Sequence, residues 1–141
     1  SPERFEPHSR ERLLAGAMIP SAWYLQAQRF RRHARLAMKS LFSQADVLIT
    51  PTTPCSATPI GAEEMVINGQ PLPVRASMGM LTQPISFLGL PVVTVPLRTA
   101  SGKPIGLQLI AAPFNEQACL RAARALEAMG VTDARVAESA A

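Results

Sequence analysis

Apolar side chains recur along the chain with two different periods, and these periods predict its helices and strands. Residues 21–43 show the clearest pattern, because apolar side chains return there every three or four positions. They are Trp23, Ala27, Phe30, Ala34, Ala37 and Leu41. This spacing places them along one side of an α-helix. A shorter helix is predicted over residues 7–19, where Ser9 could cap the start and Pro20 stops it.

Short runs of aliphatic and β-branched residues predict three strands, over residues 46–50, 92–95 and 105–110. The first should end at Pro51, because proline has no N–H to donate to a neighbouring strand. The other two are joined by a short turn, so we expect them to pair antiparallel.

Between these strands, a small hairpin is predicted over residues 65–72. Its turn would be formed by Asn68 and Gly69, a pair that tolerates positive φ angles. A short helix is then expected over residues 75–82.

The last helix is predicted to start at Asn115, its candidate cap, and to stop at Gly130. Leu120, Ala123 and Leu126 are expected to face the core.

Taken in order, these elements predict a mixed α/β fold. They form one unit over residues 1–130, and residues 131–141 are expected to be a loose tail because they lack an apolar pattern.

Composition narrows the class of protein. The 141 residues carry a net charge of +4, and 48% of them are hydrophobic, which favours surface that another segment or chain covers. No apolar run reaches the ~20 residues of a membrane helix, so no membrane segment is expected. The two cysteines and two histidines share no ligand spacing, and no glycine-rich phosphate loop is present. We therefore expect a reduced, cytoplasmic protein without metal or cofactor.

A search for catalytic side chains finds no self-contained active site. No serine lies in a Gly-x-Ser-x-Gly or Gly/Ser-rich loop, and Ser86, before a Gly-Leu-Pro turn, is the best placed. The two lysines, Lys39 and Lys103, are predicted to be solvated, which makes them poor bases. The arginines between residues 29 and 35 could contact nucleic acid. No aromatic side chains interleave on that face for base stacking, so a solvated helix face is the simpler interpretation.

Four segments resemble the amidase-signature family, in that family's order and spacing. They are Tyr24-Leu-Gln-Ala-Gln-Arg29, Asp46-Val-Leu-Ile-Thr-Pro-Thr-Thr-Pro54, Gly89-Leu-Pro-Val-Val-Thr-Val-Pro96 and Lys103-Pro-Ile-Gly-Leu-Gln-Leu-Ile110. The resemblance implies the C-terminal part of the family's mixed sheet flanked by helices. Within the family, the chain most resembles hydrolases of small urea-type or biuret-type amides. It is more distantly similar to the amidase component of glutamyl-tRNA amidotransferase.

The resemblance also implies an amide hydrolase whose catalytic residues lie elsewhere. The family cleaves carbon–nitrogen bonds with a Ser–cis-Ser–Lys triad and an oxyanion hole of backbone N–H groups. Those residues lie N-terminal to the region matched here. No position of this chain therefore inherits a catalytic role.

What the matched region implies instead is a wall of the substrate pocket, with Gly79, Thr82, Gln83 and Ser86 as candidates. Family members that use glutamine carry an aspartate at the position of Gly79, where it can pair with the substrate's ammonium group. A glycine cannot form that pair, so the implied substrate is not an amino-acid amide. Ser86 stands where many members have asparagine.

These observations favour a C-terminal fragment or subunit of an amide hydrolase, inactive by itself. Its expected partner is an amidase N-terminal catalytic segment, or a second copy of the chain, because its strands would expose unpaired edges. A small amide would be bound by the complete enzyme alone. The alternatives are a non-catalytic, self-associating assembly module that reuses this piece, and weak nucleic-acid binding through the basic helix face. The latter predicts a steep loss of affinity with salt.

Overall fold

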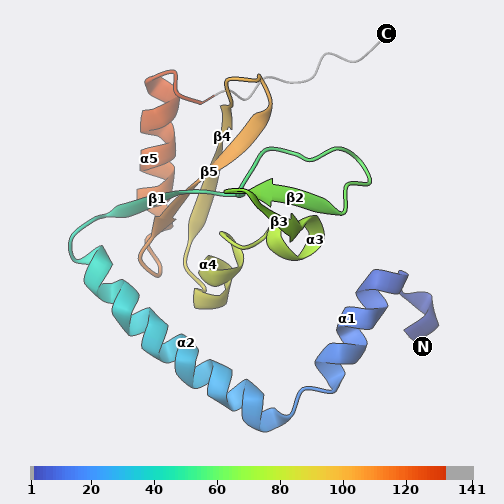
Figure 1. Ribbon diagram of the computed structural model, residues 1–141. Helices are drawn as coiled ribbons and strands as arrows, with labels where there is room; N and C mark the ends of the chain where they lie inside the picture. The colour runs from blue at the N-terminus through green and yellow to red at the C-terminus, as the bar shows by residue number, and fades with distance from the viewer. Residues whose placement is uncertain (1, 133–141) are drawn as a thin grey trace. The chain divides into compact units, whose positions relative to one another are not determined.

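A computed structural model describes residues 2–132, apart from the side chain of His8 (Figure 1). The chain divides into two compact units, Ser1–Ala37 and Met38–Ala141. Of the predicted tail, all but the first two residues lie outside the described part of the chain.

The first unit opens with a short 3-10 helix, η1 (Pro2–Arg4), and the helix α1 (Pro7–Ala17). The carboxylate of Glu6 caps α1, since it accepts hydrogen bonds from the backbone N–H and the hydroxyl of Ser9, at 2.9 and 3.0 Å. Backbone N–H groups in a first helical turn lack partners within the helix, and a side-chain oxygen just before it supplies one. The helix is thus confirmed, but the prediction that Ser9 caps it is wrong.

The long helix α2 (Ser21–Phe42) confirms the strongest periodic pattern of the sequence, and it continues from the first unit into the second. None of its described residues is buried. Trp23 and Phe30, on its apolar stripe, are 69% and 64% exposed. The stripe is therefore open to solvent in the described chain.

Three strands form an antiparallel sheet in the second unit, in the order β1-β5-β4 (Figure 1). They span Val47–Pro51 (β1), Val92–Arg98 (β4) and Pro104–Ala111 (β5). The predicted antiparallel pairing of the last two is confirmed. β1 runs slightly further than predicted, because Pro51 still pairs with Leu107 and the N–H of Thr52 donates to the carbonyl of Gly106 at 2.9 Å.

The core of this unit is centred on β5, whose residues 108–111 are all buried. The helix α5 (Glu116–Ala128) contacts all three strands and adds Ala118 and Cys119 to the core beside Ala111. The two outer strands pair on one side only within the described residues.

Two details of α5 differ from the predictions. Leu120 is 59% exposed, whereas Ala123 and Leu126 are half-buried as expected. Successive helical residues rotate by ~100°, so a face led by Ala118 and Cys119 turns Leu120 outward. Asn115 precedes the helix but makes no capping hydrogen bond through its side chain, because its backbone (φ −114°, ψ 46°) is not the extended form that aims a cap at the helix.

Gly130 ends α5 as predicted. Its φ of +69° lies in the left-handed region that glycine adopts readily. The N–H of Val131 donates to the carbonyl of Leu126 at 3.0 Å, and that of Gly130 to the carbonyl of Glu127 at 2.9 Å. This pair of bonds is the Schellman motif, which satisfies the last carbonyls of a helix.

The predicted hairpin is confirmed as β2 (Glu64–Ile67) and β3 (Gln70–Pro73), which pair antiparallel. Asn68 and Gly69 form its turn with φ values of 50° and 77°. Two positive φ angles in a row are what a two-residue hairpin turn with the twist of its strands requires.

The helix predicted over residues 75–82 is wrong in extent. The structure has a single turn, α3 (Val74–Ser77), and after a further turn a second short helix, α4 (Gln83–Leu88). Pro84 accounts for the break, because a proline has no N–H for a helix arriving from residue 75 but fits at the start of a new one.

Candidate substrate-pocket wall

The four residues predicted to form the pocket wall lie together on one short helical segment. The carbonyl of Gly79 accepts hydrogen bonds from the N–H groups of Thr82 and Gln83, at 3.1 and 2.8 Å, and that of Thr82 accepts one from Ser86 at 3.0 Å. Residues three, four and seven positions apart fall on the same side of a helix. The structure therefore brings Gly79, Thr82, Gln83 and Ser86 to one face of the 79–88 segment.

This face is open in the described chain. Gln83 and Ser86 are exposed, while Gly79 and Thr82 are half-buried. The hydroxyl of Thr82 is already engaged, since it donates to the carbonyl of Gly79 at 3.1 Å. Gln83 and Ser86 thus present the polar groups of the segment that are most accessible to a ligand.

Gln83 also occupies the space above Gly79. A methyl group built on Gly79 would lie 2.9 Å from Nε2 of Gln83 and 3.3 Å from its Cγ. Any longer side chain at position 79 would have to displace this carboxamide. A neutral hydrogen-bonding group therefore covers the position at which a carboxylate would project.

A buried glutamine connects the segment to the sheet. Gln108, on β5, is 2% exposed, and its Nε2 lies 3.1 Å from the hydroxyl of Thr50, 2.9 Å from the carbonyl of Pro51 and 3.2 Å from the carbonyl of Leu81. Sequence reasoning assigned this residue no role. Its signal was present, because Gln108 is the one polar side chain within the apolar run from Leu107 to Ala111.

Gly106 allows the sheet to close tightly next to this glutamine. A methyl group there would lie 2.6 Å from Oγ1 of Thr52 and 2.8 Å from Cγ2 of Thr94. Both are branched side chains on short stems, so neither can move away freely. Oγ1 of Thr52 is buried and has no hydrogen-bond partner.

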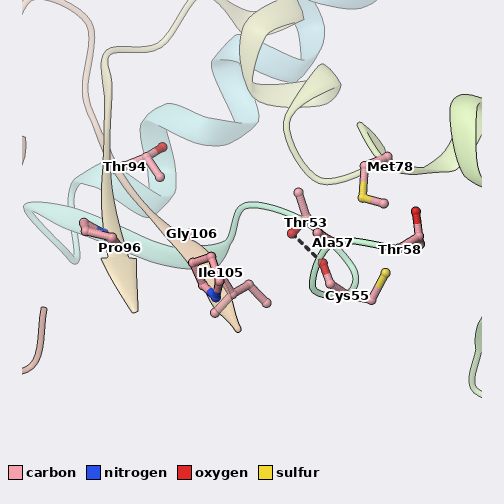
Figure 2. Close-up of a pocket in the computed structure, with 10 residues that line it drawn as sticks. Thr53, Cys55, Ala57, Thr58, Met78, Thr94, Pro96, Ile105 and Gly106 are labelled. Carbon is pink, nitrogen blue, oxygen red and sulfur yellow. Dashed lines mark hydrogen bonds between the residues drawn. The ribbon is translucent and has the colours of Figure 1, made fainter. Parts of the chain in front are cut away.

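An open cavity of about 620 Å³ lies on the same unit (Figure 2). It is lined by Thr53, Cys55, Ala57, Thr58, Met78, Thr94, Pro96, Pro104, Ile105 and Gly106. None of the four predicted wall residues lines it, although Met78 directly precedes Gly79. The wall prediction and the cavity are therefore neighbouring but different surfaces.

The cavity offers polar atoms but no base. The hydroxyl of Thr53 donates to the carbonyl of Cys55 at 2.8 Å, and the thiol of Cys55 contacts Sδ of Met65 at 3.6 Å. Its lining contains no Lys, His, Asp or Glu. A nucleophile needs such a neighbour for activation, so these residues alone give no hydrolytic site.

Elsewhere in the described chain, catalytic groups are equally separated. Lys39 and Lys103 are both exposed, as predicted. Within residues 2–132, no three His, Cys, Asp or Glu side chains gather as metal ligands do. In that same part, no helix is long and apolar enough to cross a membrane.

Cys119 belongs to the core rather than to a site. It is fully buried, and its thiol lies 3.6 Å from the carbonyl of Pro91. Burial raises the pKa of this thiol above its ordinary value of 9.0, because a thiolate would lose its hydration there. A buried, protonated thiol is inert as a nucleophile.

Comparison with known families gives the context of this arrangement. The family model for Amidase matches residues 1–120. The chain belongs to the amidase family. The resemblance inferred from the four segments is thereby confirmed.

Two relatives agree with the finer placement. AtzE of Pseudomonas sp. (strain ADP), a component of 1-carboxybiuret hydrolase, is 51% identical over 132 residues, covering 92% of this chain and 29% of that protein. The amidase-family component of the glutamyl-tRNA(Gln) amidotransferase of Roseiflexus sp. (strain RS-1) is 38% identical over 122 residues, covering 83% of this chain and 24% of its own. The higher identity to the biuret-type hydrolase confirms the predicted order of similarity.

Solved structures confirm the fold class. A chain of a vestigial protein complex, described as revealing the evolutionary origins of an s-triazine catabolic enzyme, superposes with a TM-score of 0.89 at 49% identity. It is matched over 96% of this chain and 30% of its own length. A crystal structure of an amidase gives 0.85 at 34% identity, over 91% and 30%.

The chain spans less than a third of the length of these relatives. It therefore corresponds to one part of an amidase sequence. Neither alternative from the sequence, an assembly module or a nucleic-acid-binding helix, receives support from these matches.

Proposed function

We propose that this chain supplies the sheet scaffold and one wall of the substrate pocket of an amide hydrolase, and that the catalytic triad is contributed by an amidase N-terminal segment. The observation that carries the proposal is the match itself. It covers 92% of this chain but 29% of a hydrolase component, while the described residues bring no nucleophile and base together. The chain alone is then inactive.

The wall favours a substrate without an ammonium group. Gly79 bears no carboxylate to pair with one, and the carboxamide of Gln83 covers that position. A carboxamide can donate to one ligand oxygen and accept from one ligand N–H. Small urea-type or biuret-type amides, which present both groups, fit this wall better than amino-acid amides do.

The partner of the chain is, in this proposal, the segment that carries the triad. In its absence the chain self-associates, because β1 and β4 have unpaired edges within the described residues and α2 exposes its apolar stripe. Unpaired edges and exposed apolar surface both promote association between copies.

Ammonia release from biuret-type amides and from glutamine tests the proposal. We would assay the chain alone, an amidase N-terminal segment alone, and the two together or fused. Activity on biuret-type amides in the combined sample alone is the expected result. Activity of the chain alone would contradict the proposal, because it would require a catalytic group within these 141 residues.

A matched pair of variants tests the wall. Gly79→Asp places a carboxylate at the position that Gln83 now covers, whereas Gly16→Asp adds the same charge in α1, far from the wall in sequence. The first variant should lower activity on biuret-type amides, and the second should leave that activity near the parent level. Equal effects of both variants would remove the wall from the proposal.

A further inference from the structure

The carboxamide of Gln108 gathers hydrogen-bond acceptors from two separate parts of the second unit. Two of them, the hydroxyl of Thr50 and the carbonyl of Pro51, lie on β1. The third, the carbonyl of Leu81, lies in the turn between α3 and α4. One buried side chain therefore joins β1, β5 and the turn.

Sheet register explains why this position can do so. Gln108 stands opposite Thr50 on β1 and opposite Thr94 on β4, so it occupies the middle of the central strand. A side chain there is held by pairing on both sides and is 2% exposed. Its amide group is thus aimed by the most rigid element of the unit.

We propose that Gln108 is a positioning residue, which fixes the 79–88 segment against the sheet and so sets the place of the pocket wall. This inference rests on the proposed function, because it gives the segment a ligand to face. Leu81 lies between Gly79 and Thr82, and its carbonyl belongs to the peptide unit that contains the Thr82 nitrogen. Holding that carbonyl orients the peptide from which the helical run to Ser86 begins.

The chemistry of the site selects a glutamine. All three neighbours at Nε2 are oxygen atoms that accept hydrogen bonds, and an amide N–H₂ supplies two donors for them to share. Methionine has nearly the same shape and no donor. An ionised glutamate would set its charge against these oxygens, and a protonated one would restore a single donor.

Hydrogen exchange in the full chain tests the role. In Gln108→Met, the N–H groups of Gln83 and Ser86 should exchange at least about tenfold faster, the factor that corresponds to one buried acceptor left unpaired. Ile110→Val is the matched control, because Ile110 is 1% exposed on the same strand and its bonds do not reach the turn. That control should speed exchange of the sheet and the segment by similar factors. The same uniform pattern in Gln108→Met would overturn the proposal.

A second variant removes the dependence on one substitution. In Gln108→Glu, exchange of the segment, corrected for its intrinsic pH dependence, should slow again as acid protonates the introduced carboxyl. The wild-type chain adds a measurement without any variant, since the side-chain N–H₂ of buried Gln108 should exchange at least about tenfold more slowly than that of exposed Gln83. Equal rates for the two carboxamides would also overturn the proposal.

Activity separates this inference from the proposed function. If the combined enzyme is active, Gln108→Met should raise KM more than it lowers kcat, because it displaces the wall and not the triad. If the wild-type mixture is inactive, the proposed function fails, and hydrogen exchange still decides whether Gln108 holds the segment.

Discussion

The helix α2 and the strand β5 carry comparable amounts of apolar side chain and treat it in opposite ways. On β5, residues 108–111 are all buried, and Leu109 is 0% exposed. On α2, no described residue is buried, and Trp23 remains 69% exposed. Both segments follow their expected periods closely. Periodicity therefore indicates which side of an element is apolar, while burial depends on what covers that side.

The difference matters for stability. Apolar surface stabilises a fold in proportion to the area that leaves water. The sheet with α5 gains this within the described chain, whereas the α2 stripe gains little of it there. In the proposed enzyme, the stripe becomes useful surface for the remaining part of the amidase.

The largest expected contrast comes from truncating one apolar side chain in each region. Leu109→Ala should lower the free energy of unfolding of the chain by about 2–5 kcal/mol, because it opens a cavity in a fully buried position. Phe30→Ala should lower it by less than about 1 kcal/mol, since Phe30 is already 64% exposed. Urea unfolding followed by circular dichroism measures both. A larger loss for Phe30→Ala would show that α2 is covered in solution.

A smaller contrast comes from adding one methyl group. Gly106→Ala should destabilise the chain by about 1–3 kcal/mol, because the new group lies 2.6 Å from the hydroxyl oxygen of Thr52. Gly16→Ala, in α1, meets nothing within 4 Å and should stabilise that helix by about 0.5 kcal/mol. Thermal unfolding of both variants, with Thr52→Ala added to relieve part of the contact, checks the assignment. No difference between the two glycine variants would contradict it.

The two helix starts should differ by less. Glu6→Ala removes the carboxylate that caps α1 and should cost about 0.5–1 kcal/mol of local stability. Asn115→Ala should cost no more than about 0.3 kcal/mol, because Asn115 makes no capping bond to α5 through its side chain. Hydrogen exchange of the first turn of each helix reports the change. Equal effects would mean that Asn115 caps α5 in solution.

The smallest effect is on pH dependence. Burial raises the pKa of Cys119 in the folded chain above 9.0, so the folded state holds this proton more tightly than the unfolded state does. The resulting stability is complete below pH 9.0 and should be lost progressively as pH rises through the raised folded value. Unfolding midpoints measured from about pH 7 to about pH 10.5 test this, and Cys119→Ala should flatten the alkaline decline. A decline that survives in that variant would assign it to other groups.

Local signals in the sequence predicted much of the fold. The hairpin at Asn68-Gly69 and the stop at Gly130 are set by which residues accept a positive φ, and both are confirmed. Pro84 carries a signal of the same kind, which favours a helix start and explains why the 75–82 prediction was wrong in extent. Glu6 and Asn115 show the limit of such signals, because a cap depends on the backbone angles next to the helix as well as on the side chain.

The candidate site was less predictable. Gly79, Thr82, Gln83 and Ser86 were selected by family resemblance, and their common face follows from their spacing. Their role as a wall stays a prediction. Gln108 could not be assigned from the sequence, because its three acceptors belong to Thr50, Pro51 and Leu81, between 27 and 58 positions away.

By itself, the sequence determined the order of helices and strands, the two glycine-dependent turns and the membership in the amidase family, since each rests on residues close together or on motifs in order. The tertiary structure alone decided which apolar side chains are buried, why Gly106 must be a glycine and what Gln108 holds. Those properties depend on atoms that folding brings within a few ångströms from distant positions, and local periodicity carries no information about such distances.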